Sequence, residues 1–289
     1  MSKLPDDWWV SAPGLECLVK TFERHMLGLV ILVPGSKPDC PKREVFTGML
    51  LDYHGLTFWL TAGHVIRELD KIRRAYAREQ TTAVWYDRCD RREASGIPTE
   101  LTSMKWCALQ SHGVDVGVAH LDSYYVELIR ANEDRVFLTP QVWQGPEESK
   151  PDGYALVGFP AEHVSLRSMV PQGQGFTVNV DCALACVPVR QIERKVADRS
   201  TNFWRDEHAF YGELVDMGDK QMPLGSVVGM SGGPIFSVSS EATDLRYHLV
   251  AIQSAWLPSP RLIRAARIAD ADTVMQAGLR WAMRELGLD

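Results

Sequence analysis

Three short segments hold a serine, a histidine and an aspartate in settings that suit nucleophilic catalysis. Ser231 lies in the apolar segment VVGMSGGPIF, where glycines stand close on both sides of it. His64 follows an apolar segment in FWLTAGHV, and Asp115 precedes an alternating one in GVDVGVAHL. A serine hydroxyl is a weak nucleophile that needs an adjacent base such as histidine, and a carboxylate can orient that base. The three residues are therefore candidates for one catalytic set.

Each of the three residues, taken alone, has a simpler explanation. The glycines around Ser231 fit a tight hairpin turn. His64 fits a histidine at the end of a strand, and Asp115 fits an acid in a turn, a role in which Asp122 competes with it. Their joint occurrence, in the order His64, Asp115, Ser231, favours catalysis over three separate structural roles.

Most of the chain consists of short apolar segments bounded by glycine, proline, asparagine or aspartate, which is typical of β-strands. The segment MLLDYHGLTFWL predicts a hairpin with His54 and Gly55 at its turn. Apolar residues at helical spacing predict an amphipathic helix over residues 65–79. Residues 261–286 predict one or two helices, with a break near residues 270–272. Many short strands favour a barrel or sandwich over a parallel α/β sheet.

The composition narrows the class of protein and the compartment. The net charge of −6 disfavours nucleic acid or an anionic membrane as a partner, because both require a clustered basic face. No segment reaches the ~18 apolar residues that a membrane helix needs. The six cysteines and the polar N-terminal segment predict reduced thiols in the cytoplasm. Without CxxC or HExxH spacing, we expect no metal and no cofactor.

The three segments resemble motifs of the trypsin/chymotrypsin-like serine peptidases. TAGHV is similar to the family's TAAHC or TAAHV, DVGVAHL to DIAL or DVAL, and GMSGGP to GDSGGP or GNSGGP. The hairpin before His64 looks like the bacterial, disulfide-free branch, and YALVGFP and YHLVAIQSAW resemble further family segments. The resemblance covers roughly residues 25–258.

The resemblance implies an all-β fold, the chymotrypsin-like double β-barrel, with an amphipathic helix after the catalytic histidine and helices at the C-terminus. The whole chain, 1–289, would be a single peptidase domain. Its N-terminal barrel would span residues 20–140, its C-terminal barrel 150–258, and a C-terminal helical extension 259–289.

The resemblance also implies a serine endopeptidase that works through an acyl-enzyme. His64 would be the base, Asp115 would orient it, and the N–H groups of Gly229 and Ser231 would form the oxyanion hole. The implied partners are a protein or peptide substrate and an activating protein. The family's substrate-binding positions fall on a further set of residues: Gly225, Ser226, Ser254, Ala255 and Trp256.

Several positions depart from the family pattern. Met230 stands where secreted members have an aspartate that pairs with a newly cut N-terminus, and Val65 replaces the cysteine beside the histidine. Gly225 provides no acid at the floor of the specificity pocket, so a preference for Lys or Arg is not expected. Trp256 would narrow that pocket toward small apolar side chains.

Three alternatives remain open. The first is a pseudo-peptidase or interaction module with the same fold. The second is a latent protease that a partner activates, as small bacterial trypsin-like proteins in defence operons suggest. The third is an α/β-hydrolase esterase, because Gly229 to Gly233 also fits G-x-S-x-G. That family places the histidine after the serine, and only His248 follows Ser231 here.

Overall fold

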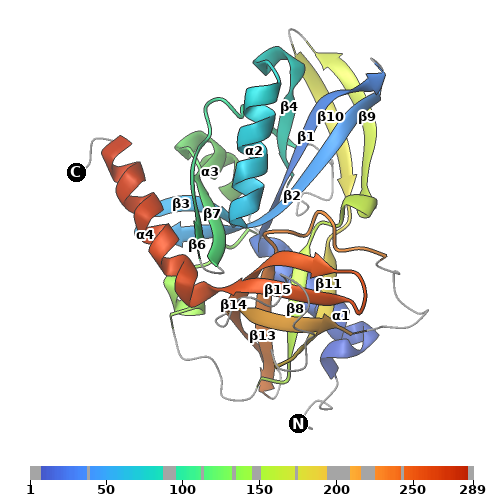
Figure 1. The fold of residues 1–289 in the computed structure, drawn as a ribbon, viewed down its shortest axis with the longest axis vertical. Helices are drawn as coiled ribbons and strands as arrows, with labels where there is room; N and C mark the ends of the chain where they lie inside the picture. Colours follow the sequence, from blue (N-terminus) through green and yellow to red (C-terminus); the bar gives the residue numbers. More distant parts are fainter. Residues whose placement is uncertain are drawn as a thin grey trace.

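The structure, a computed structural model, combines an open β-sheet, a closed β-barrel and four α-helices among the residues that it describes (Figure 1). These residues are 8–37, 40–86, 96–111, 114–131, 135–144, 151–172, 175–193, 209–215, 225–241 and 244–285. The helices are α1 (Ala12–Phe22), α2 (Gly63–Ala75), α3 (Ser123–Arg130) and α4 (Ile268–Glu285). Short 3-10 turns are η1 (Trp8–Val10), η2 (Glu23–His25), η3 (Arg78–Gln80), η4 (Pro140–Val142) and η5 (Ala161–His163).

The first half of the chain builds an antiparallel sheet of seven strands in the order β5-β4-β1-β2-β3-β7-β6. Their bounds are β1 (Met26–Lys37), β2 (Cys40–Tyr53), β3 (Leu56–Thr61), β4 (Thr82–Tyr86), β5 (Ile97–Thr99), β6 (Lys105–Ser111) and β7 (Val114–His120). The expected hairpin is confirmed: β2 pairs with β3, and His54 and Gly55 at its turn have φ of 51° and 77°. The helix expected over residues 65–79 is present as α2, but it begins at Gly63 and ends at Ala75.

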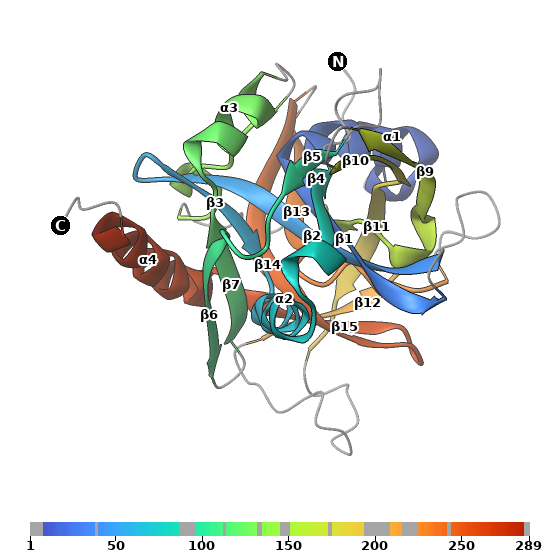
Figure 2. The ribbon, with the colours of Figure 1, turned by 90° about the horizontal axis from the view of Figure 1, so that it is seen from above.

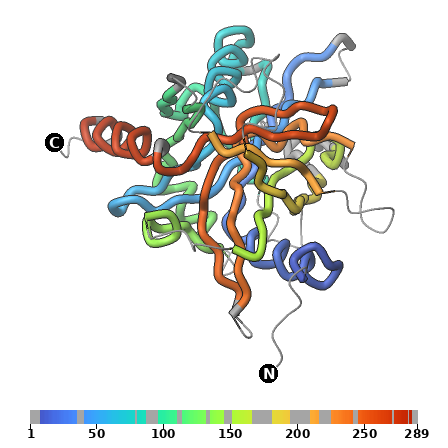
Figure 3. Tube along the Cα trace, turned by 60° about the horizontal axis from the view of Figure 1, so that its bottom comes forward, coloured from blue at the N-terminus to red at the C-terminus, as the bar shows by residue number. Residues whose placement is uncertain are grey.

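The second half builds a closed barrel of six strands in the order β11-β12-β15-β14-β13-β8. Its strands are β8 (Gly153–Gly158), β11 (Ala185–Gln191), β12 (Phe210–Leu214), β13 (Pro234–Glu241), β14 (Asp244–Leu257) and β15 (Leu262–Arg267). A separate hairpin pairs β9 (Val164–Gln172) with β10 (Gly175–Cys182). Figure 3 shows the long hairpin of β13 and β14, after which the chain passes through β15 into α4.

The expected all-β double β-barrel is wrong. Only the strands after residue 152 close into a barrel, whereas those before residue 121 form an open sheet, and the structure as a whole is mixed α/β. Within the described residues the outer strands of that sheet, β5 and β6, do not pair, and β5 has only three residues. Closure depends on strand tilt and stagger, which the spacing of apolar segments in a sequence does not reveal.

The expected C-terminal helical extension is also partly wrong. Within residues 259–289, Leu262–Arg267 form β15, which pairs with both β12 and β14 and so completes the barrel. The helix α4 begins only at Ile268 and continues through residues 270–272 without the expected break. Residues 286–289 lie outside the described ranges. Without β15, the backbone N–H and C=O groups along one edge of β12 and of β14 would lack partners in the barrel. Pairing these groups outweighs the helical propensity of the segment.

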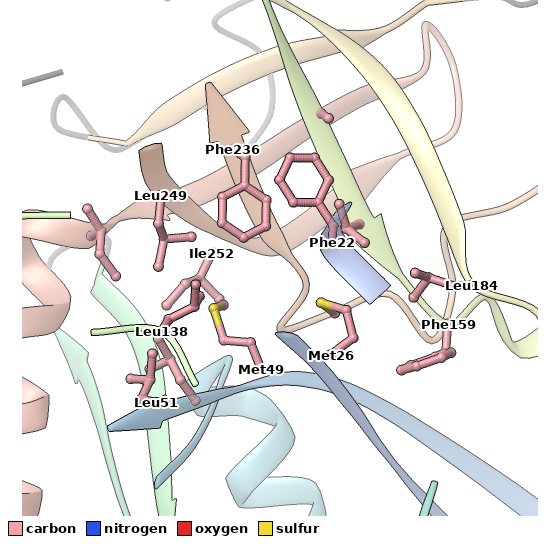
Figure 4. Close-up of a cluster of buried hydrophobic side chains, with 14 of the residues drawn as sticks. Phe22, Met26, Met49, Leu51, Leu138, Phe159, Leu184, Phe236, Leu249 and Ile252 are labelled. Atoms are coloured by element: carbon pink, nitrogen blue, oxygen red, sulfur yellow. The ribbon is translucent and has the colours of Figure 1, made fainter. Parts of the chain in front are cut away.

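Strand β1 separates two hydrophobic cores because its side chains alternate between the faces of the sheet. Met26 and Val30 face a core shared with the barrel, while Leu27 and Leu29 face a core covered by α2. Figure 4 shows the shared core, where side chains of β1 and β2 meet those of β13, β14 and α1. Both faces of the sheet are therefore buried, and the sheet and barrel are packed against each other over a common interior.

The helices hold the two halves together from outside. In α1, Phe22 stacks on Phe236 of β13, with ring centroids 4.3 Å apart. The last helix, α4, leaves the barrel and packs on β7 and β6 of the first sheet, as Figure 2 shows from above. There Gly278 lies so close to Val118 that a β-carbon would be 2.7 Å from that side chain. Strand β7 is thus held between β3 and β6 and covered by α4.

In the described part of the chain, no helix is both long and apolar enough to cross a membrane. In the same part, no three His, Cys, Asp or Glu side chains come together as a metal site would require.

A buried histidine joins η2 to the barrel and makes the stability of the fold sensitive to acid. His25 is fully buried, with Nδ1 2.8 Å from the Val136 carbonyl oxygen and Nε2 2.8 Å from the Tyr247 hydroxyl. Burial lowers the pKa of His25 from 6.5 to about 4. Between these two pH values the unfolded chain binds a proton that the folded protein does not, so stability falls as pH falls.

We predict that lowering the pH from 7.5 to 5 reduces the free energy of unfolding through His25 by about 2 kcal/mol. Urea unfolding at both pH values measures it, and His25→Asn should lose this part of the pH dependence. The control is His54→Asn at the exposed hairpin turn, which should keep the wild-type pH dependence. An unchanged pH dependence in His25→Asn would contradict the assignment.

Candidate functional site

Asp115 lies at the N-terminus of α2, directly beside His64. Strand β7 carries Asp115 and pairs with β3, which leads through Ala62 into α2. The His64 backbone N–H donates to Asp115 Oδ1 at 2.9 Å. The first N–H groups of a helix have no partner within the helix, and this end of the helix dipole is positive. The start of α2 therefore provides a favourable place for a buried carboxylate.

The His64 ring makes a short hydrogen bond to the same carboxylate. Its Nδ1 is 2.6 Å from Asp115 Oδ2, and the Asp115 side chain is 8% exposed while that of His64 is 35% exposed. Because a carboxylate can only accept, Nδ1 carries the proton, and Nε2 of the neutral ring is an acceptor. The arrangement leaves Nε2 in the state that a general base requires.

Arg67 is a third member of this group that the sequence reasoning missed. It lies one helical turn after His64, and its Nη2 is 3.6 Å from Asp115 Oδ1. Residues three apart on a helix share a face, so the expected helix could have indicated this neighbour. Asp115 thus accepts from a backbone N–H and an imidazole N–H, and a guanidinium lies beside it.

Asp122, the competing acid, has a different role. Its carboxylate caps α3 by accepting from the Tyr124 N–H at 3.0 Å. Of the two aspartates, Asp115 is the one that contacts His64.

The turn that holds Ser231 packs against the strand end that leads to His64. At Gly232, where φ is +90°, a β-carbon would lie 2.0 Å from Thr61 Oγ1 and 2.9 Å from the Ala62 nitrogen. Only glycine fits this contact, which brings the half-buried Ser231 of the barrel to the segment preceding His64. No hydrogen bond joins Ser231 to the His64 ring among the described residues; catalytic bonds of this kind often form only when substrate binds.

The backbone N–H groups of the Ser231 turn fall into two sets. Those of Met230, Gly232 and Gly233 donate to Val227, Gln253 and Met230 carbonyls, respectively, at 2.8–3.0 Å. Those of Gly229 and Ser231 have no acceptor among the residues that the structure describes. Unpaired N–H groups at a half-buried turn are unusual unless a ligand or water satisfies them.

The direction of each of these two N–H groups is fixed by the carbonyl of the same peptide unit, because that carbonyl accepts a hydrogen bond. In a trans peptide the C=O and N–H point in opposite directions. The Val228 carbonyl accepts from the Ala161 N–H at 2.8 Å, so the Gly229 N–H points away from Ala161. The Met230 carbonyl accepts from the Gly233 N–H at 2.8 Å, which fixes the Ser231 N–H in the same manner.

Thr47 of β2 ties this turn to both halves of the molecule. Its hydroxyl is completely buried, donates to the Gly229 carbonyl oxygen at 2.7 Å and accepts from the Phe159 N–H at 2.9 Å. The Thr47 carbonyl in turn accepts from Thr61 Oγ1 at 2.7 Å. Thr47 and Phe159 are 112 residues apart, and no local pattern in the sequence links one to the other.

The residues expected to bind substrate lie on two segments. Gly225 and Ser226 precede the Ser231 turn, and both backbone N–H groups donate to Glu162 Oε1, at 3.0 and 3.3 Å. Glu162 lies in η5, a segment that the sequence reasoning did not associate with this site. An acid is thus present beside Gly225 after all, but it comes from elsewhere in the chain.

The other three expected residues lie on β14. The Ser254 hydroxyl donates to the Arg264 carbonyl at 3.3 Å, and no bond joins it to Asp115 within the described residues. Ala255 pairs with Arg264 across the bulge that follows Gln253. Trp256 packs against the interior of the barrel, in the cluster that also contains the fully buried Met230.

The chain matches no model of a known protein family, and no curated protein matches it.

We predict that Gly232→Ala lowers the free energy of unfolding by about 3 kcal/mol or more, because strain at positive φ adds to the clash with Thr61. The control is Gly55→Ala, at φ +77° with open space around it, which should cost only the strain, about 1 kcal/mol. Urea unfolding of both variants measures the difference. Equal losses would show that the Ser231 turn does not pack on Thr61 as described.

Proposed function

We propose that this protein is a serine endopeptidase that hydrolyses peptide bonds through Ser231, His64 and Asp115. The observation that carries the proposal is the joint presence of an imidazole oriented by an acid and of two anchored backbone N–H groups, those of Gly229 and Ser231, that have no acceptor among the described residues. The first serves to activate a hydroxyl, and the second serves to bind a developing oxyanion. The resemblance of the three sequence segments to trypsin-like serine peptidases supports the same function.

In the proposed reaction the Ser231 hydroxyl attacks the substrate carbonyl and passes its proton to His64 Nε2. Asp115 accepts from Nδ1 and stabilises the imidazolium that forms. The N–H groups of Gly229 and Ser231 bind the oxyanion of the tetrahedral intermediate. His64 then gives the proton to the leaving amine, which leaves an acyl group on Ser231. Water, deprotonated by His64, attacks this ester; His64 returns that proton to the Ser231 oxygen as the acyl bond breaks and the second product leaves as a carboxylic acid.

A latent form of the same enzyme is the second candidate. The observation that favours it is the missing hydrogen bond between Ser231 and the His64 ring among the described residues. In this form the pair would close only when a substrate or an activating protein docks. Labelling of Ser231 that requires a protein partner would distinguish it from an enzyme that is active by itself.

We predict that a fluorophosphonate probe labels the wild-type protein and not Ser231→Ala, because only an activated serine reacts with it. Mass spectrometry of the labelled peptide should place the adduct on Ser231. Labelling of another residue, or none in the presence of candidate partners, would contradict the proposal. Ser103 provides the control, since Ser103→Ala removes an exposed hydroxyl in the turn before β6 and should leave the adduct on Ser231.

We predict that Asp115→Asn reduces the rate of labelling and of peptide cleavage by about 10⁴-fold, as expected when the carboxylate that orients the imidazole is lost. Asp122→Asn is the control, because it removes the acid that caps α3, and its rate should stay within about twofold of wild type. Circular dichroism should show both variants folded. A loss confined to Asp122→Asn would show that the acid had been assigned wrongly.

A further inference from the structure

Glu162 binds the start of the Ser231 loop from a different segment of the barrel. Its Oε1 accepts from the N–H groups of both Gly225 and Ser226, at 3.0 and 3.3 Å. A carboxylate that accepts two backbone N–H groups makes stronger bonds than a neutral acceptor would. The His163 ring also lies near this oxygen, with Nε2 at 3.9 Å.

The same short segment also fixes the peptide that carries the Gly229 N–H. Ala161, next to Glu162, donates its N–H to the Val228 carbonyl at 2.8 Å. Gly229 lies directly on this segment, since a β-carbon there would be 2.7 Å from the Ala161 nitrogen and 2.8 Å from the Phe159 carbonyl oxygen. Residues 225–229 are thus attached to η5 at both ends, by Glu162 at the start and by Ala161 at the Val228–Gly229 peptide.

The segment that bears Glu162 is itself firmly held. Phe159 is buried, and its N–H donates to the Thr47 hydroxyl at 2.9 Å. After it, the His163 N–H donates to the Pro160 carbonyl at 3.0 Å, and the His163 carbonyl accepts from the Ala183 N–H at 3.2 Å. Glu162 therefore connects residues 225 and 226 to a segment, residues 159–163, that is itself held by hydrogen bonds.

We propose that Glu162 is a positioning residue for the anion-binding turn. By holding the N–H groups of residues 225 and 226, its carboxylate keeps the Val228 carbonyl on Ala161 and hence the Gly229 N–H directed at the substrate oxyanion. The proposal rests on the proposed function for its catalytic consequence, but not for the attachment of the loop. Glu162 touches no reacting atom, so its removal should lower the rate of chemistry more than the affinity for substrate.

The test compares Glu162→Ala and Glu162→Gln with the wild type and with Glu213→Ala. Glu213 is the matched control because it is a partly exposed glutamate of the same barrel, paired with Arg190 at 3.4 Å. The first measurement, hydrogen exchange of residues 225–233 followed by mass spectrometry, does not depend on activity. We expect exchange about tenfold faster in Glu162→Ala, an intermediate change in Glu162→Gln, whose amide oxygen still accepts, and none in Glu213→Ala.

The second measurement is the kinetics of peptide cleavage and of fluorophosphonate labelling. Glu162→Ala should lose about 10- to 100-fold in kcat and in labelling rate, less than complete removal of an oxyanion donor, with KM within about twofold. Glu162→Gln should recover part of the rate, and the melting temperatures should show all variants folded. A merely structural role would lower the melting temperature without this division between kcat and KM.

The outcomes separate the two proposals. Unchanged exchange in Glu162→Ala would overturn the attachment of the loop by Glu162, whatever the activity. Faster exchange with wild-type kcat and labelling would overturn its positioning role while the proposed function stands. An unreactive wild-type protein, tested with and without partners, would overturn the proposed function and with it the catalytic consequence of Glu162. The exchange measurement would still test whether Glu162 holds residues 225 and 226.

Discussion

The buried hydroxyl of Thr47 is the interaction on which the geometry of the site depends. It lies in the first sheet, yet its two hydrogen bonds go to Phe159 and Gly229 of the second half of the chain. A fully buried hydroxyl that donates and accepts at once leaves neither neighbour free to rotate without losing a bond. The position of the Ser231 turn relative to the sheet is therefore fixed by chemistry as well as by packing.

The two halves of the molecule contribute different parts of the candidate site. The open sheet supplies the proposed base and its acid, because β3 and β7 are neighbours and place His64 and Asp115 at one end of α2. The barrel supplies Ser231 and, in the turn before β13, the two N–H groups that have no acceptor among the described residues. The hydrophobic core shared by both halves (Figure 4) holds these parts together.

Local patterns in the sequence predicted local structure well. The apolar alternation of the strands, the turn at His54 and Gly55 and the amphipathic helix after His64 follow from side-chain periodicity and backbone preference, and the structure contains all three. The approach of His64 to Asp115 was predicted from motifs. The closure of the first sheet was predicted wrongly, as was β15, because strand pairing between distant segments depends on the whole fold and not on any window of sequence.

The residues that sequence reasoning missed share one physical property. Thr47, Arg67, Ala161 and Glu162 act through one or two hydrogen bonds or a charge to distant partners, and such contacts leave no periodic pattern in the chain. Arg67 alone had a local signal, its spacing from His64. Thr47 and Gly229 are 182 residues apart in the sequence, and only the fold brings them together.

The link between Thr47 and Gly229 also determines when, during synthesis of the chain, the candidate site can be assembled. Contacts between such distant segments form late, since a long loop must close before they repay its entropy. A ribosome-bound chain that has emerged only through Asp115 would hold the base and its acid, but neither nucleophile nor anion trap. On the proposed function, the catalytic set would be complete only after the second half of the chain has been synthesised and has folded onto the first.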